Sequence, residues 1–194
     1  MKWKFVYTDA ALGEAWRNHF DAVNDVEVCK GDICRVACDA VVSPANSFGF
    51  MDGGLDYALS ERFGWDLQKR LQAAIMQRPL GELLVGEAII VETRDAEVPW
   101  LVSAPTMRVP MRLRQSINAY LAMKAILTSV RAHQRQPKIE VVAVPGLGTG
   151  CGRLPASTAA RQMKVAYEEV VFGSARYPAD FREAQSRQFA LNRR

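Results

Sequence analysis

The 194-residue sequence has no long apolar segment. Its best candidates, residues 99–106 and 141–145, are much shorter than the roughly 18 uncharged apolar residues that cross a bilayer. The first residues include Lys2, Lys4 and Asp9, and they lack the apolar stretch of about 7–15 residues that a secretory signal requires. These absences lead us to expect a cytoplasmic protein with no membrane partner.

Cysteine and histidine are scarce. The cysteines follow none of the paired C-x-x-C spacings of structural zinc sites, and only His19 and His133 could complete such a site. We therefore predict no metal site and expect buried, free thiols, because unpaired cysteine usually packs as a small apolar residue. The four cysteines are Cys29, Cys34, Cys38 and Cys151.

Neither sign of charge dominates the composition. The 25 lysines and arginines outnumber the 21 acidic residues and give a net charge of +4, which mildly favours an anionic partner of any kind. Apolar residues at 49% and charged residues at 24% are ordinary globular values and exclude disordered, collagen-like and low-complexity chains. The length predicts one domain over residues 1–194.

Hydrophobic patterning predicts strands that alternate with helices. Short β-branched or aromatic runs predict the strands, and apolar residues at helical spacing predict the helices. This alternation implies parallel pairing and an α/β fold, specifically a three-layer α/β/α sandwich. Strands are predicted at 3–7, 26–29, 40–42, 86–92, 100–104 and 139–144, and helices at 9–20, 55–78 with a break at Gly64, 119–130 and 155–170.

Two glycine-rich segments, residues 48–54 and 146–152, each follow a buried strand and precede a helix. Ligands of open α/β sheets bind at the carboxyl ends of the strands, and glycine lets backbone N–H groups approach phosphate oxygens. The pair therefore favours a phosphate-bearing ligand over two ordinary turns. Neither segment has the Walker spacing or a G-x-G-x-x-G motif followed by an acid, which disfavours nucleotide hydrolysis and dinucleotide oxidoreduction.

Five blocks occur in order along the chain: GDI (31–33), DAVVSPAN (39–46), GGLDYAL (53–59), GEAIIV (86–91) and PGLGTGCG (145–152). Together they resemble the macrodomain family of ADP-ribose-binding modules. The resemblance covers residues 28–171 and leaves an N-terminal piece, 1–25, and a tail, 172–194. It implies a mixed, mostly parallel central sheet and, as partner, ADP-ribose or an ADP-ribosylated protein, with no cofactor.

The resemblance implies a set of ligand contacts. Asp32 would accept a hydrogen bond from the adenine amine, although it could instead cap a turn, and Ile33 would contact the adenine ring. Gly53 and Gly54 would flank the distal ribose. The second glycine segment would wrap the diphosphate and the proximal ribose with its backbone amides, through Gly146, Leu147, Gly148, Thr149, Gly150 and Cys151.

The resemblance also implies that Asn46 and Asp56 are catalytic. They align with the last asparagine of the family's N-A-A-N block and with the aspartate of its G-G-V-D segment. An asparagine can donate to a ribose hydroxyl and an aspartate can accept from water, which suits cleavage of an ADP-ribosyl bond. The alternatives are that Asn46 caps its loop and that Asp56 interacts only with the helix dipole.

Departures from the family pattern keep three functions open. Ser43 and Pro44 replace an asparagine and an alanine, and Cys151 and Arg153 replace the bulky side chains that hydrolase relatives often carry. The sequence therefore supports ADP-ribose binding better than hydrolysis, and a non-catalytic reader is the main alternative. A nucleic-acid-binding module is third, because the clustered aromatic and basic stripe of a single-strand binder is missing. Neither the physiological substrate nor the oligomeric state follows from the sequence.

The ends of the chain indicate a circular permutation. Macrodomains usually finish with a strand and a helix, but residues 172–181 contain a glycine and a proline and make a poor central strand. Residues 3–7 and the helix after them resemble the terminal unit, so we predict that they take its place. Any adenine-stacking contact would then come from just after Tyr7. The tail is expected to form a solvated helix packed through Phe181, Ala184 and Phe189.

Overall fold

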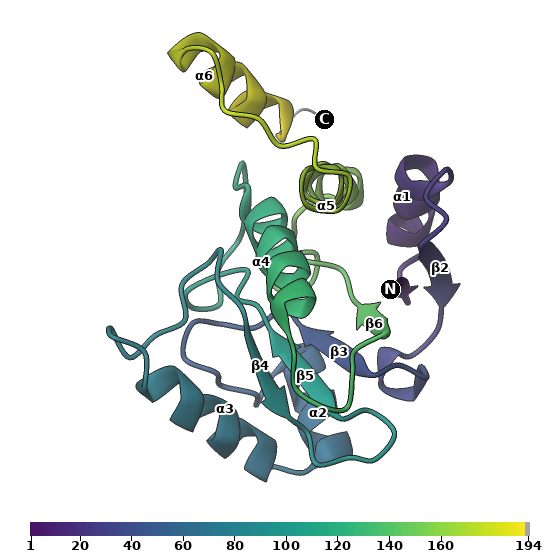
Figure 1. Cartoon of the computed structure of the whole chain (residues 1–194), viewed down its shortest axis with the longest axis vertical. Helices are drawn as coiled ribbons and strands as arrows, with labels where there is room; N and C mark the ends of the chain where they lie inside the picture. The colour runs from purple at the N-terminus through teal and green to yellow at the C-terminus, as the bar shows by residue number, and fades with distance from the viewer. Residues whose placement is uncertain (193–194) are drawn as a thin grey trace.

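The computed structural model describes residues 1–192, in which strands and helices alternate along most of the chain (Figure 1). The strands are β1 (Lys2–Tyr7), β2 (Val26–Lys30), β3 (Ala40–Ser43), β4 (Ile89–Glu92), β5 (Trp100–Ser103) and β6 (Val141–Val144). The helices are α1 (Ala10–Phe20), the 3-10 turn η1 (Ile33–Arg35), α2 (Gly54–Phe63), α3 (Asp66–Met76), α4 (Asn118–Ala132), α5 (Ala156–Val171) and α6 (Phe181–Ala190).

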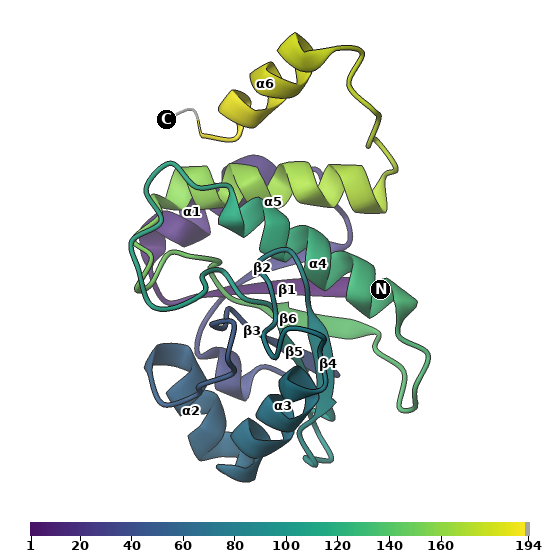
Figure 2. The ribbon, with the colours of Figure 1, turned by 90° about the vertical axis from the view of Figure 1, so that its left-hand side faces the viewer.

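The strands form one six-stranded sheet in the order β2-β1-β6-β3-β5-β4. All neighbours pair in parallel except β4, which is antiparallel to β5. Helices α1, α4 and α5 cover one face of the sheet, and α2 and α3 cover the other (Figure 2). The predicted α/β/α sandwich with a mixed, mostly parallel sheet is therefore confirmed.

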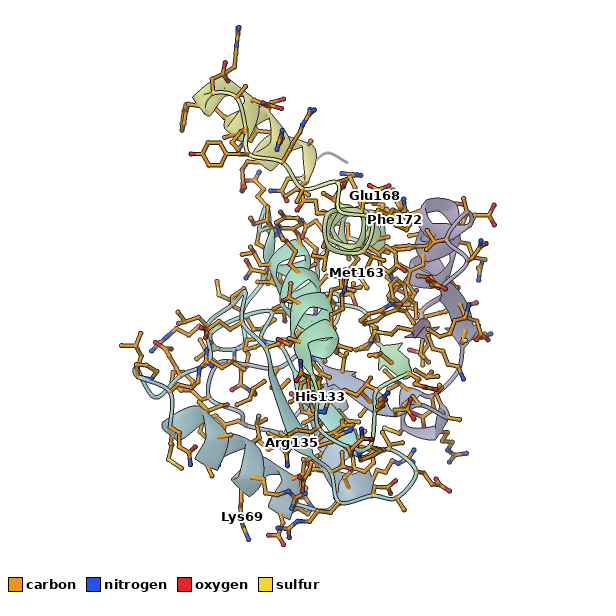
Figure 3. The ribbon with its side chains drawn as sticks, in the orientation of Figure 1. Lys69, His133, Arg135, Met163, Glu168 and Phe172 are labelled. Carbon is orange, nitrogen blue, oxygen red and sulfur yellow. The ribbon has the colours of Figure 1, made fainter. Side chains whose placement is uncertain are left out.

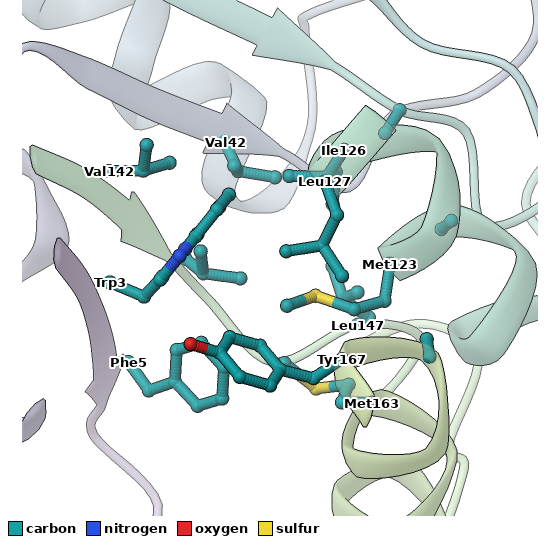
Figure 4. Packing of buried hydrophobic residues seen from close by; sticks show 14 of the residues in the cluster. Trp3, Phe5, Val42, Met123, Ile126, Leu127, Val142, Leu147, Met163 and Tyr167 are labelled. Atoms are coloured by element: carbon teal, nitrogen blue, oxygen red, sulfur yellow. The ribbon is translucent and has the colours of Figure 1, made fainter. Parts of the chain in front are cut away.

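The larger core lies between one face of the sheet and the helices α1, α4 and α5 (Figure 4). The Phe5 ring contacts Trp16 and Phe20, with ring centroids 5.1 and 4.8 Å apart. The Trp16 indole N–H donates to the sulfur of Met163 at 3.4 Å, and Figure 3 shows Met163 on the side of α5 that faces the sheet. The N-terminal strand and helix thus belong to the main core of the molecule.

The smaller core lies under α2 and α3 on the opposite face, where Leu59, Leu71 and Ile75 are buried against the sheet. Gly64 separates the two helices with a φ of 84°, a conformation that favours glycine, and this confirms the predicted break. The strand predicted from residue 86 begins only at Ile89. Gly86 has a φ of 100° and belongs to a turn, so it cannot extend the strand.

The strand β1 lies inside the sheet, where it pairs with β2 on one side and with β6 on the other. Within residues 1–192, no strand follows α5, and residues 172–180 run without regular structure to α6. This part of the chain therefore makes no central strand, as its glycine and proline indicate. The N-terminal strand is thus an internal strand of the sheet, and the circular permutation stays a prediction.

The tail helix α6 lies beyond α5, away from both cores (Figures 1 and 2). Phe181 is 80% exposed and Phe189 is 61% exposed, so the prediction that the helix packs through these rings is wrong. The tail is instead attached just after the helix, where Leu191 is buried and the Gln162 amide donates to its carbonyl at 3.3 Å. Burial of Leu191 and a hydrogen bond from α5 thus replace the expected packing of the α6 rings.

The four thiols are free, but only Cys38 is buried. Burial raises the pKa of Cys38 to about 11. The expectation of buried thiols is wrong for Cys151, which is exposed, because the second glycine segment carries it at the surface. Among the described residues there is no group of three or more metal-ligating side chains, and no helix is long and apolar enough to span a membrane.

The substitution Phe5→Ala should lower the free energy of unfolding by about 3–5 kcal/mol, because it leaves a cavity among Trp16, Phe20 and the buried face of β1. Urea unfolding monitored by circular dichroism measures this loss. The matched control Phe181→Ala removes the same atoms from an exposed ring and should change stability by less than about 0.5 kcal/mol. Equal losses in the two variants would contradict the role of β1 in the core.

Candidate ligand-binding and catalytic site

The two glycine-rich segments lie at the same edge of the sheet. Residues 44–53, the first glycine loop, follow β3, and residues 145–155, the second glycine loop, follow β6. Because β3 and β6 are parallel neighbours in the centre of the sheet, their carboxyl ends lie side by side. Asp32 follows β2 at the same edge, where the N–H of Gly31 donates to the carbonyl of Tyr7 at 2.9 Å.

Tight packing explains most glycines of the second loop. Gly148 has a φ of 72°, and a Cβ on it would lie 2.8 Å from the Leu113 side chain. A Cβ on Gly152 would come within 2.5 Å of the Gly148 carbonyl, and one on Gly146 within 2.6 Å of Leu12. These glycines let Leu113 and Leu12 press against the backbone of the loop, so the loop is held in one shape.

The amides of the second loop are unpaired. The loop's carbonyls are used: Leu113 donates to Gly152 at 2.7 Å, and Leu154 donates to Gly148 at 3.0 Å. In contrast, the backbone N–H groups of residues 146–152 have no hydrogen-bond acceptor anywhere in residues 1–192. Backbone donors rarely stay unpaired in a folded protein, and consecutive free N–H groups form a site for anions.

Asp32 caps the short helix η1, so the alternative role expected for it, capping a turn, is present in the structure. One carboxylate oxygen accepts the N–H of Cys34 at 3.0 Å, and the other lies 3.6 Å from the Arg35 guanidinium. The carboxylate is half-exposed and therefore still accessible to a ligand. The side chain of Ile33 is buried in the smaller core, which leaves its backbone for any contact with an adenine ring.

Asn46 holds the first glycine loop in shape. Its carbonyl oxygen accepts the N–H groups of Phe48 and Phe50 at 3.1 and 3.3 Å, and its amide donates to the Phe50 carbonyl at 2.8 Å. The loop-capping role is therefore present in the structure. One amide hydrogen of Asn46 is left over, because only one of its two N–H donors is used. A contact between Asn46 and a ribose hydroxyl stays a prediction.

Asp56 is a buried acid near the start of α2. Its side chain accepts the Ser43 hydroxyl at 2.5 Å, and the residue is only 9% exposed. Burial raises the pKa of Asp56 to about 6, and the hydrogen bond from Ser43 limits this rise. A carboxylate with a pKa just below neutrality is well suited to act as a general base.

Sequence reasoning missed the role of Ser43. The only signal was its position, at the end of a buried strand and in place of an expected asparagine. The structure brings Ser43, Asn46 and Asp56 together at the carboxyl end of β3. Gly53 and Gly54 precede Asp56, and a Cβ on either would meet no atom within 4 Å, so their backbone faces open space.

The residues directly after Tyr7 carry no aromatic ring that could stack on an adenine. The next residues are Thr8 and Asp9, and Asp9 caps α1 by accepting the N–H of Ala11 at 3.0 Å. Tyr7 itself is buried, and its hydroxyl accepts a hydrogen bond from Arg17 at 2.9 Å. Any adenine contact from this segment would therefore be non-aromatic.

A mostly parallel sheet with two glycine loops at one edge and a buried acid beside them defines this chain as an α/β domain. The model of one protein family, the macro domain, matches residues 42–163. The chain therefore belongs to the macrodomain family.

The chain is also similar to individual proteins and to solved structures. An uncharacterized protein of Aquifex aeolicus is 31% identical over 139 residues, which are 72% of this chain and 78% of that protein. The macrodomain of Mycobacterium tuberculosis DarG has a TM-score of 0.58 at 23% identity and covers 72% of this chain and 87% of its own. The Oceanobacillus iheyensis macrodomain, solved with ADP, has a TM-score of 0.57 at 21% identity and covers 70% and 72%. The structural matches show the shared fold.

The raised pKa of Asp56 predicts a pH dependence of stability. Since the folded chain binds this proton more tightly than the unfolded chain, the free energy of unfolding should fall as pH rises through about 4 to 6. The total cost is about 3 kcal/mol. In Asp56→Asn this component should disappear, so the variant should gain stability relative to the wild type as pH rises.

Urea unfolding of both proteins across this pH range measures the difference. Asp52→Asn is the matched control, because it makes the same change at an exposed aspartate on the first glycine loop, four residues before Asp56. Parallel stability curves for the wild type and Asp56→Asn would refute the burial of an acid with a raised pKa.

Proposed function

We propose that this macrodomain binds ADP-ribose, or an ADP-ribosyl group on a protein, and hydrolyses the bond that links ADP-ribose to its acceptor. The observation that carries the binding proposal is the run of unpaired backbone amides at residues 146–152. A diphosphate offers several anionic oxygens for these donors, and α5 begins directly after the loop with its positive dipole end. The Oceanobacillus iheyensis macrodomain, a variant of which was solved with ADPR, supports this ligand.

With the diphosphate at the second glycine loop, the adenine and the distal ribose would lie on either side of it. The adenine would lie toward Asp32, whose half-exposed carboxylate suits the exocyclic amine. The distal ribose would lie toward the first glycine loop, where Gly53 and Gly54 offer open backbone. Binding then rests on backbone donors and one carboxylate, so the net positive charge contributes only a general attraction for the anion.

Hydrolysis would use the buried acid. At neutral pH the Asp56 carboxylate is mostly ionised, because its pKa is about 6. The oxygen that accepts from Ser43 is occupied, which leaves the other oxygen to take a proton from water. The water oxygen bonds to the anomeric carbon of the distal ribose as the bond from that carbon to the acceptor oxygen breaks. For an ester of an acidic side chain, the acceptor leaves as a carboxylate and Asp56 holds the proton.

Titration calorimetry should detect ADP-ribose binding, with adenosine as the comparison ligand. Adenosine lacks the diphosphate and should bind at least about 100-fold more weakly, since two lost hydrogen bonds to charged oxygens are worth about 3 kcal/mol. Equal affinities would show that the second glycine loop does not hold the diphosphate. Absence of ADP-ribose binding at about millimolar ligand would defeat the proposal for both an enzyme and a reader.

Release of ADP-ribose from an ester-linked ADP-ribosylated protein tests the catalytic half. Asp56→Asn keeps the shape of the side chain and an acceptor for Ser43, but it removes the base, so the rate should fall by about 100-fold or more. Its affinity for ADP-ribose should stay within about threefold of the wild type. Asp25→Asn makes the same change at an exposed aspartate just before β2, at the opposite end of the strand from the site, and should release ADP-ribose at the wild-type rate. A wild-type chain that binds ADP-ribose without releasing it would be a reader.

We also infer that the whole chain is one permuted macrodomain. The family match spans residues 42–163 and so begins after the N-terminal strand and helix. These two elements nevertheless build the larger core and supply an internal strand. This topology supports the view that residues 1–25 replace the terminal strand and helix of other members.

A further inference from the structure

A small polar cluster lies inside the sheet edge that carries the site. Ser43 and Ser103 are in register at the ends of the parallel strands β3 and β5, so their side chains share one face of the sheet. Both are fully buried. Asp56 reaches this cluster from α2 and accepts the hydroxyl of Ser43 at 2.5 Å. The hydroxyl of Ser103 has no hydrogen-bond partner among residues 1–192.

The cluster contains no second charge. Only burial and the hydrogen bond from Ser43 shift the pKa of Asp56, and no ionisable side chain on β3, β5, α2 or α3 contributes within the described residues. The nearby polar side chains are neutral: Ser60 donates to the Met51 carbonyl, and Gln68 accepts the Met51 N–H. Among the described residues, Ser43 is therefore the one side chain that stabilises the ionised form of Asp56.

We propose that Ser43 is the positioning residue of this site, holding one oxygen of the Asp56 carboxylate so that the other is aimed at the attacking water. Its catalytic consequence rests on the proposed hydrolysis, whereas its effect on the carboxylate does not. A hydroxyl suits this task because it donates one hydrogen bond to the charged group and adds no charge that would compete with it. Ser43 lies at the end of β3, which sets the position of its hydroxyl, and Asp56 lies in the first turn of α2, which sets the position of its carboxylate.

Ser103 decides how the test must be designed. Ser103 is paired with Ser43 on the neighbouring strand, at the usual strand spacing of about 5 Å, and its hydroxyl has no hydrogen-bond partner among residues 1–192. When Ser43 is replaced by alanine, the Ser103 hydroxyl could turn into the space and donate to Asp56 in its place. The double variant Ser43→Ala/Ser103→Ala removes both hydroxyls. In this variant no serine of the cluster can replace the lost hydrogen bond to Asp56.

The direct measurement is an NMR titration of the Asp56 carboxyl carbon in the full chain. In Ser43→Ala/Ser103→Ala, the pKa of Asp56 should rise by about 1 above the wild-type value, because a hydrogen bond to the charged form is lost. Ser43→Thr keeps a hydroxyl and should restore the wild-type pKa. Ser60→Ala, a buried serine on the same helix as Asp56, should leave it unchanged. An unchanged pKa in the double variant would overturn the proposal.

The pH profile of ADP-ribose release gives the second measurement. The acidic limb for the double variant should move to higher pH by the same amount, and kcat should fall while KM stays near the wild-type value. A wild-type chain that shows no release, together with the expected NMR change, would defeat hydrolysis and leave the Ser43–Asp56 interaction standing. Release with an unshifted acidic limb would support hydrolysis and overturn the role of Ser43.

Discussion

The parallel pairing of β3 with β6 is the constraint on which the rest of the structure depends. Ala40 of β3 is in register with Val142 of β6, 102 positions later in the chain, and the carboxyl ends of the two strands therefore lie side by side at one sheet edge. Each strand then continues into a glycine loop, one carrying the buried acid on its following helix and the other carrying the unpaired amides. A shift in this register would separate the groups that the site requires.

The N-terminal strand makes this pairing possible in the centre of the sheet. It covers the free edge of β6 and turns Phe5 toward α1 and α5, where aromatic rings fill the larger core. Because β6 pairs with a strand on each side, its carboxyl end holds the start of the second loop in place. Leu12 of α1 and Leu113 then press on the loop from outside the sheet.

The candidate site lowers the stability of the folded chain. Burial of an ionised carboxylate opposes folding, and the amides of the second loop give up hydrogen bonds that other loops make. Two apolar cores on opposite faces of the sheet offset these costs. Such local conflicts are expected where a protein holds chemical groups ready for a ligand.

The sequence by itself determined the α/β class, most strands and helices, the break at Gly64 and the family, because these follow from periodicity, glycine positions and ordered motifs. Only the tertiary structure decided that Ser43 contacts Asp56, that Asn46 caps its own loop, that Cys151 is exposed and that the rings of α6 lie in solvent. The physical reason is that burial and hydrogen bonding depend on which elements meet in space. Residues 13 positions apart, such as Ser43 and Asp56, carry no local signal of their contact.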